Sequence, residues 1–235
     1  VRRWGLGIFP ARPLVPARYH PAVARLALAP PETRPEAAVT LELPHPDGTL
    51  HRYALTQVPV MAPALAARYP RLRTFAGRSL DEPGATVRLA WTPAGLHAQL
   101  LGADGAVSTI LGDEAATSPS SLYQSRAQAP TDFDCQALLP PDAAPQRPGD
   151  TPPAPPAPYG GQLRTLRLAV AANSEFVRRL GGGTTAGTMI ALVNLVNSLN
   201  GVYEPEMALR LQLVANNDKL IFADAATDPF GPNPS

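Results

Sequence analysis

The most distinctive side chain in this 235-residue sequence is its single thiol, Cys135, which lies directly before a proline-rich segment. A thiolate is a good zinc ligand, and a zinc ion lowers the pKa of a thiol that binds it, so Cys135 is a candidate metal ligand. The alternative is a free thiol without a chemical role. The neighbouring Asp134 favours that alternative mildly, because a carboxylate does not lower a thiol pKa. A lone cysteine excludes a disulfide framework within this chain.

The histidines are few, and their spacing does not match a zinc-binding helix. They are His20, His45, His51 and His97, and none has a second histidine four residues further on. A zincin helix needs two histidines one turn apart, with the catalytic glutamate between them. We therefore expect no catalytic site and no zinc ligand set of this type in the chain, and no activity from the chain alone. His97 is expected on the surface of a strand.

Two further groups of residues have weak claims to chemistry. The glycines 181–183 precede a predicted helix, but no Lys follows at P-loop spacing, so we expect a turn rather than a phosphate site. Several carboxylates near predicted helix and strand ends could in principle form a paired-acid or calcium site. We expect them to be solvated charges; they are Glu204, Glu206, Asp218, Asp224 and Asp228.

The composition excludes some partners. The net charge is +1, from 20 basic and 19 acidic residues, and the sequence has no long basic run. Such a balance favours neither nucleic acid nor an anionic membrane as partner. Hydrophobic residues make up 45% of the chain, enough for a packed core, but no window reaches the length of apolar residues that a membrane-spanning helix needs.

The front part of the chain shows the alternation of antiparallel strands. Hairpin signals separate the segments, such as Asp47-Gly48 between the first two. One short helix is predicted over 61–69, and Gly77 is predicted to close the third strand. Residues 112–134 show no periodicity. The predicted strands are 39–43, 50–55, 72–76, 86–91, 96–101 and 107–111, which together indicate an antiparallel β-rich module within an α+β chain.

A proline-rich stretch divides the sequence. Residues 139–158 carry many prolines and no large apolar residue besides Leu139 at the start. Such a composition prefers solvated polyproline II and is a frequent site of proteolysis. We therefore predict a β-rich domain over 1–138, a linker over 139–158 and a second unit over 159–235.

The second unit has the pattern of a βαβ crossover. A strand is predicted over 163–172, and a helix capped by Thr184 or Thr185 should run to about Tyr203, with Pro205 ending it. A second strand is expected over 208–214 and a short third over 220–222. Strand, helix and strand predict a parallel pair with a right-handed crossover. Because so small a unit cannot stand alone, we expect further chain to complete its sheet.

Three segments of this unit resemble the start of the catalytic domain of the reprolysin-like metallopeptidases, in the metzincin clan, of secreted bacterial type. They read LRTLRLAVAANSEFVRRLGG (163–182), TTAGTMIALVNLVNSLNGVYEPEM (184–207) and LRLQLVANNDKLIFADAATDPF (209–230). The segment 58–101 is similar to the propeptide of the same family. The family's zinc signature, H-E-x-x-H-x-x-G-x-x-H followed by a Met-turn, is absent from this chain.

The resemblance implies the front part of a secreted zinc endopeptidase precursor. The complete enzyme would use zinc, and its partners would be the remainder of its own catalytic domain and peptide or protein substrates. The propeptide would cover the active cleft, Cys135 would occupy the fourth zinc position as a cysteine switch, and the linker 139–158 would hold the activation cut. A different class remains open: a non-catalytic binding or adhesion module, or a stand-alone inhibitory prodomain.

Overall fold

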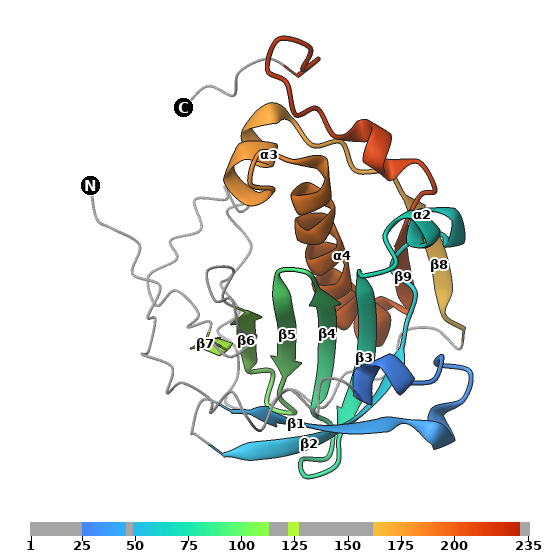
Figure 1. Ribbon diagram of the computed structural model, residues 1–235. Coiled ribbons are helices and arrows are strands. Elements are labelled where there is room, and N and C mark those ends of the chain that lie inside the picture. The colour runs from blue at the N-terminus through green and yellow to red at the C-terminus, as the bar shows by residue number, and fades with distance from the viewer. Residues whose placement is uncertain (1–24, 46–48, 113–121, 127–161, 231–235) are drawn as a thin grey trace, which may run out of the picture.

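The computed structural model describes residues 25–45, 49–112, 122–126 and 162–230 (Figure 1). They form an α+β structure with a curled antiparallel sheet of seven strands and a small parallel sheet of two. The large sheet is a simple meander, in which each strand pairs antiparallel with the next along the chain. Its strands are β1 (Val39–Pro44), β2 (Leu50–Gln57), β3 (Arg73–Ser79), β4 (Thr86–Thr92), β5 (Gly95–Leu101), β6 (Val107–Gly112) and β7 (Leu122–Arg126).

The curl of the large sheet encloses an apolar core. In Figure 1, β1 and β2 run across the lower ends of the other strands. Tyr53, Phe75 and Leu89, from three successive strands, are fully buried together. Gly77 was predicted to close β3, but it lies inside this strand. A Cβ at this position would approach Leu55 Cδ2 to 2.5 Å, so the position has no room for a side chain. The missing side chain lets β2 and β3 pack where the sheet bends.

Three other features of the front part differ from the sequence predictions or refine them. Strand β7 was not predicted, since its residues lack a clear hydrophobic alternation, yet its backbone pairs with β6 from Ser108↔Arg126 to Gly112↔Leu122. The predicted helix over 61–69 is the shorter α2 (Pro63–Arg68), which begins at a proline, a residue well suited to the first turn. Before β1, the chain makes two 3₁₀ turns, η1 (Arg25–Leu28) and η2 (Pro35–Ala37).

The second unit contains the predicted parallel pair. Strand β8 (Arg164–Leu168) pairs in parallel with β9 (Leu209–Leu213), and the long helix α4 (Thr185–Met207) precedes β9. Thr184 caps α4 as predicted, since its hydroxyl accepts a hydrogen bond from the Gly187 amide at 3.0 Å.

A short helix, α3 (Ser174–Leu180), was not predicted. Asn173 caps it by accepting a hydrogen bond from the Phe176 amide at 2.9 Å, and the Asp228 carboxylate accepts one from the Ser174 amide at 2.6 Å. The Asn-Ser-Glu sequence at 173–175 is a local signal for such a helix start.

Helix α4 was predicted to end at Pro205, but it continues to Met207. A proline removes one backbone hydrogen bond, and here only the last turn loses it, so the helix tolerates the residue. Ala208 then ends the helix in the left-handed conformation, at φ 52°, with its amide donating to the Glu204 carbonyl at 3.1 Å.

The predicted third strand over 220–222 is mostly absent. The chain forms instead the 3₁₀ turn η3 (Asn217–Leu220), followed by a single bridge between Ala172 and Ile221. The buried Asn217 replaces a strand pairing, because its side chain accepts from the Val170 amide at 2.8 Å.

Helix α4 lies against both sheets and joins the two parts of the molecule (Figure 1). One side packs on β9, and another packs on the outer face of β3, β4 and β5. A second apolar core forms there, from α4 residues such as Met189 and Val193 together with Met61 and Leu65 of the front part. The two units therefore share one core. No helix among the described residues combines the length and apolarity that crossing a bilayer requires.

Candidate functional site

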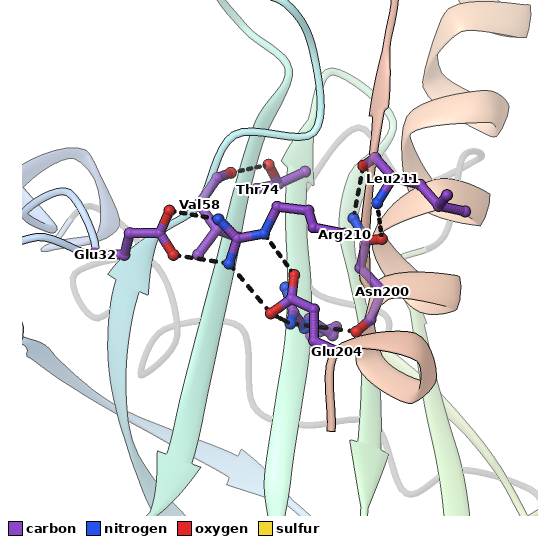
Figure 2. A network of polar contacts seen from close by, with 8 residues as sticks. Glu32, Val58, Thr74, Asn200, Glu204, Arg210 and Leu211 are labelled. Atoms are coloured by element: carbon purple, nitrogen blue, oxygen red, sulfur yellow. Dashed lines mark hydrogen bonds and ion pairs between the residues drawn. The ribbon is translucent and has the colours of Figure 1, made fainter. Parts of the chain in front are cut away.

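Where α4 meets the large sheet, a group of buried charges joins the two parts of the chain (Figure 2). Glu204, in the last turn of α4, pairs with Arg88 of β4 and with Arg210 of β9. Its carboxylate accepts from Arg210 Nε at 2.6 Å and from Arg210 Nη2 at 3.1 Å. One carboxylate thus binds guanidinium groups from both sheets.

A second carboxylate completes the group. Glu32, between η1 and η2, accepts two hydrogen bonds from Arg210, one of them from Nη2 at 2.8 Å. The Glu32 amide donates to the Gln57 carbonyl at 3.0 Å, which fixes this segment beside the end of β2. The side chains of Arg88 and Arg210 are each only 8% exposed. Two buried guanidinium groups are therefore neutralised by two carboxylates, of which Glu204 is mostly buried and Glu32 is 35% exposed.

The carboxylates and guanidinium groups of this cluster stabilise one another in their ionised forms. Burial works to raise the pKa of Glu204, but hydrogen bonds and charges from Arg210 and Arg88 outweigh it, so the pKa is lowered. Burial likewise works to lower the pKa of Arg210, yet Glu204 and Glu32 leave it raised. Nη1 of Arg88 is buried and has no hydrogen-bond partner among the described residues. Loss of Glu204 would therefore leave Arg88 without a carboxylate partner and Arg210 with Glu32 alone.

Two α4 residues next to Glu204 set how closely the helix approaches the strands. A Cβ at Gly201 would lie 2.9 Å from Arg88 Cγ and 3.1 Å from Gln99 Oε1, so only glycine fits between α4 and the large sheet. Asn200 faces β9, where its amide accepts from the Leu211 amide at 2.7 Å and donates to the Leu211 carbonyl at 2.9 Å. The Asn200 side chain thus makes, with the backbone of Leu211, the hydrogen bonds that a neighbouring strand would otherwise make.

The front part also contacts the free side of β9. Leu213 forms a parallel bridge with Met61, since the Leu213 amide donates to the Val60 carbonyl at 2.8 Å and the Ala62 amide donates to the Leu213 carbonyl at 2.9 Å. Arg68 of α2 then pairs with Asp218 at 2.8 Å. This segment therefore extends the small sheet by one short pairing beyond β9.

Several predicted site residues have a different role from the one expected. Glu204 was expected to be a solvated charge, and that is wrong, because it is the centre of the buried group. Asp218 pairs with Arg68 and Asp228 binds the start of α3, whereas Glu206 and Asp224 are exposed. Among the described residues, no three of these five carboxylates lie within metal-ligand distance of one another.

The other predicted positions are placed as follows. The glycines 181–183 form the turn between α3 and α4, with positive φ at Gly182 and Gly183, as predicted. His97 lies on β5 but is partly buried rather than at the surface, and burial lowers its pKa. Cys135 and the linker 139–158 lie outside the described residues.

Three members of the group around Glu204 were not predicted from the sequence, namely Arg88, Arg210 and Glu32. Both arginines alternate with apolar residues in their strands, and that pattern is typical of a side chain that faces water. Here α4 covers the face that would otherwise be solvated, so the arginines point to a helix end instead. The carboxylate partner of these arginines on α4 can be identified only when the position of the helix on the outer face of the large sheet is known.

The zinc that the resemblance implies does not fit the second unit of this chain. Residues 162–235 contain neither His nor Cys, so they provide no nitrogen or sulfur ligand. The arrangement of this unit supports packing and recognition of another part of the protein, and no catalytic step can be assigned to it.

No curated protein matches the chain in sequence. Residues 162–235 match the family model described as Metallo-peptidase family M12B Reprolysin-like. The matched stretch begins just before β8 and includes α3, α4 and β9, that is, the whole second unit. The family implies that the complete enzyme uses zinc. The match supports a metallopeptidase-related protein of the reprolysin-like type.

Proposed function

We propose that this chain is the front part of a secreted, zinc-dependent endopeptidase precursor of the reprolysin-like type. The observation that carries the proposal is the family match, which coincides with a βαβ unit that has one open edge. Within the described residues, β8 pairs only with β9, and Leu163 and Leu166 are 43% and 46% exposed. Further strands of a peptidase domain would pair at this edge and cover these side chains.

We further propose that the front sheet is the propeptide of this precursor. It packs against α4 and β9 of the matched unit through the group around Glu204 and through the shared apolar core. A module that binds the opening unit of a peptidase domain so extensively is suited to hold that domain in a latent form. In this proposal Cys135 supplies the ligand that silences the zinc. Cleavage within 139–158 lets Cys135 leave the zinc while the front sheet stays bound to the matched unit, and this releases activity on peptide and protein substrates.

The test uses the complete gene product that contains this chain. We expect the intact precursor to hydrolyse a mixed peptide library slowly, and proteolysis within 139–158 to raise the rate at least tenfold. A zinc chelator should abolish the activity and added zinc should restore it. The variant Cys135→Ser should raise the rate of the uncut precursor, and Cys135→Ser in the cut protein is the matched control.

Two results would decide against the proposal. If the cut and zinc-loaded protein hydrolyses no peptide, the chain is not part of a peptidase, and a non-catalytic binding module replaces this proposal. If the cut protein is active but the uncut precursor is equally active, the peptidase assignment stands and the latency role is wrong.

A further inference from the structure

Three metal-binding side chains meet at the turn end of the β1–β2 hairpin, in the front part of the chain. His45 directly follows β1, His51 lies in β2, and Glu82 lies in the turn between β3 and β4. One ligand atom from each of the three lies within 4.8 Å of the others, and all three residues are partly buried. The antiparallel register accounts for the meeting, since Leu43 pairs with His51 across the hairpin.

The turn that carries Glu82 is held next to β2 by contacts of its own. The Arg52 side chain donates to Asp81 at 2.6 Å, and the Arg52 amide also donates to this carboxylate at 2.6 Å. The Leu80 amide donates to the Arg52 carbonyl at 2.8 Å, and the Glu82 amide donates to the Ser79 hydroxyl at 2.9 Å. The position of Glu82 relative to β2 is therefore fixed without any metal.

One nitrogen in this cluster lacks the partner that its burial requires. Nδ1 of His51 is buried and has no hydrogen-bond partner among the described residues. The nearest carboxylate oxygen, Oε2 of Glu82, is 3.9 Å away, too far for a hydrogen bond. Two donors of one tetrahedral zinc ion lie roughly 3.4 Å apart, because each is about 2.0–2.2 Å from the metal. A small movement of Glu82 would thus place an ion between the two atoms.

The remaining contacts resemble the outer partners of a metal site. Nε2 of His45 lies 2.8 Å from the Tyr53 hydroxyl, and a ligating histidine normally engages its second nitrogen in this way. Burial, followed by the charges of Glu82 and Asp81, raises the pKa of Tyr53 to about 12, so the phenol is neutral at neutral pH. The other Glu82 oxygen, Oε1, accepts from the Ala103 amide at 3.3 Å. Both His45 and Glu82 are therefore oriented by a second group.

The two imidazole rings are stacked, with centroids 3.8 Å apart and an interplanar angle of 23°. This stacking brings the ring nitrogens of the two histidines close together, as a shared metal ion requires. A histidine binds a metal through its neutral imidazole.

We propose that His45, His51 and Glu82 form a binding site for a borderline divalent transition metal ion, with Zn²⁺ as the physiological occupant. Two imidazole nitrogens and one carboxylate select zinc-type ions over Ca²⁺ and Mg²⁺, which prefer oxygen ligands alone. The ion ties the end of the β1–β2 hairpin to the β3–β4 turn and leaves a fourth position for water. The site is independent of the proposed peptidase activity.

The test is a calorimetric titration of Zn²⁺ into the metal-free 235-residue chain, in the Cys135→Ser background so that the thiol does not contribute. We expect one saturable site with a dissociation constant in the micromolar range or tighter. His51→Gln and Glu82→Gln should each weaken binding at least tenfold, because each removes one of three ligands. His97→Gln, which removes a histidine on β5 outside the cluster, should leave the affinity unchanged.

Two independent readings support the titration. Zn²⁺ should raise the melting temperature of the parent chain but not that of Glu82→Gln. Because Glu82 lies in a turn, its replacement by Gln should not unfold the chain, so lost binding would reflect the lost ligand. Co²⁺ should give the visible absorption bands of a four-coordinate site in the parent only. Absence of saturable Zn²⁺ binding in the parent, or equal affinity in the parent and Glu82→Gln, would overturn the proposal.

Discussion

At the scale of single residues, Glu204 is the carboxylate that links the buried guanidinium groups of Arg88 and Arg210. Its side chain is 15% exposed and neutralises two guanidinium groups that are themselves almost removed from water. Breaking a buried ion pair by removing one partner commonly costs about 3–5 kcal/mol, because the other charge remains buried. The value of Glu204 to the fold therefore depends on its negative charge rather than on its volume.

We expect Glu204→Gln to lower the free energy of unfolding by about 3 kcal/mol at pH 7. Because the folded-state pKa of Glu204 is lowered, its contribution is complete above the ordinary value of 4.5 and is lost as the pH falls below it. The difference in unfolding free energy between wild type and variant should therefore shrink as the pH falls below about 4.5. Urea unfolding followed by circular dichroism at several pH values measures this.

The control for this experiment is Glu206→Gln, an exposed carboxylate two residues further along α4. Its stability should follow the wild-type value at every pH. A Glu204→Gln variant with the stability and pH profile of the control would show that the buried charges contribute nothing to the fold.

At the scale of elements, the approach of α4 to β4 and β5 depends on a residue without a side chain. Gly201→Ala should gain up to about 1 kcal/mol from helix propensity. The added Cβ would lie 2.9 Å from Arg88 Cγ, 3.1 Å from Gln99 Oε1 and 3.2 Å from Leu101 Cδ1. Overpacking of this kind typically costs about 1–3 kcal/mol. The ion pair of Arg88 with Glu204 opposes a movement of the Arg88 side chain away from the added Cβ.

We therefore predict that Gly201→Ala destabilises the chain by about 1–2 kcal/mol in thermal or urea unfolding. Leu195→Ala, at a side chain on the same helix that is 47% exposed, should change stability by less than about 0.5 kcal/mol. A Gly201→Ala variant more stable than wild type would mean that α4 can shift away from the large sheet without loss.

The hold of α4 on β9 can be tested separately at Asn200. Asn200→Ala leaves the amide and the carbonyl of Leu211 without their partner, at a cost of about 1–3 kcal/mol. Hydrogen exchange offers a local reading, and the Leu211 amide should exchange at least tenfold faster in the variant. Unchanged exchange at Leu211 would show that another group, or water, replaces the side chain.

Much of the element order could be predicted from the sequence, and the failures have physical causes. Strands β1, β2, β4, β5, β6 and β9 follow from alternation, and α4 follows from its apolar stripe and the Thr184 cap. The helix end was wrong because Pro205 disrupts only hydrogen bonds that a last turn can lose. The group around Glu204 could not be predicted, because it depends on α4 covering the outer face of the large sheet, a contact between residues over 100 positions apart.

At the scale of the whole molecule, the front part and the matched unit behave as one folded body in the described residues. Buried charges, a shared apolar core and a backbone bridge all join them. The connecting linker over 139–158 is therefore not what holds the two parts together.

We predict that cleavage at a protease site inserted within 139–158 leaves the two fragments associated. They should co-elute in size-exclusion chromatography at pH 7, and the combination of this cut with Glu204→Gln should weaken the association. Separate elution of the wild-type fragments at pH 7 would show that the covalent linker is required.

The small sheet can grow in one direction only. The bridge from Met61 occupies the outer side of β9 at Leu213, whereas β8 has no further strand beside it in the described part of the chain. Any strand that lengthens this sheet must therefore arrive at β8, where Arg164 and Arg167 place two positive charges along the edge. An incoming segment with acidic residues opposite them would be accepted. A second copy of β8 would be repelled, which disfavours pairing between two copies of this chain at their β8 edges.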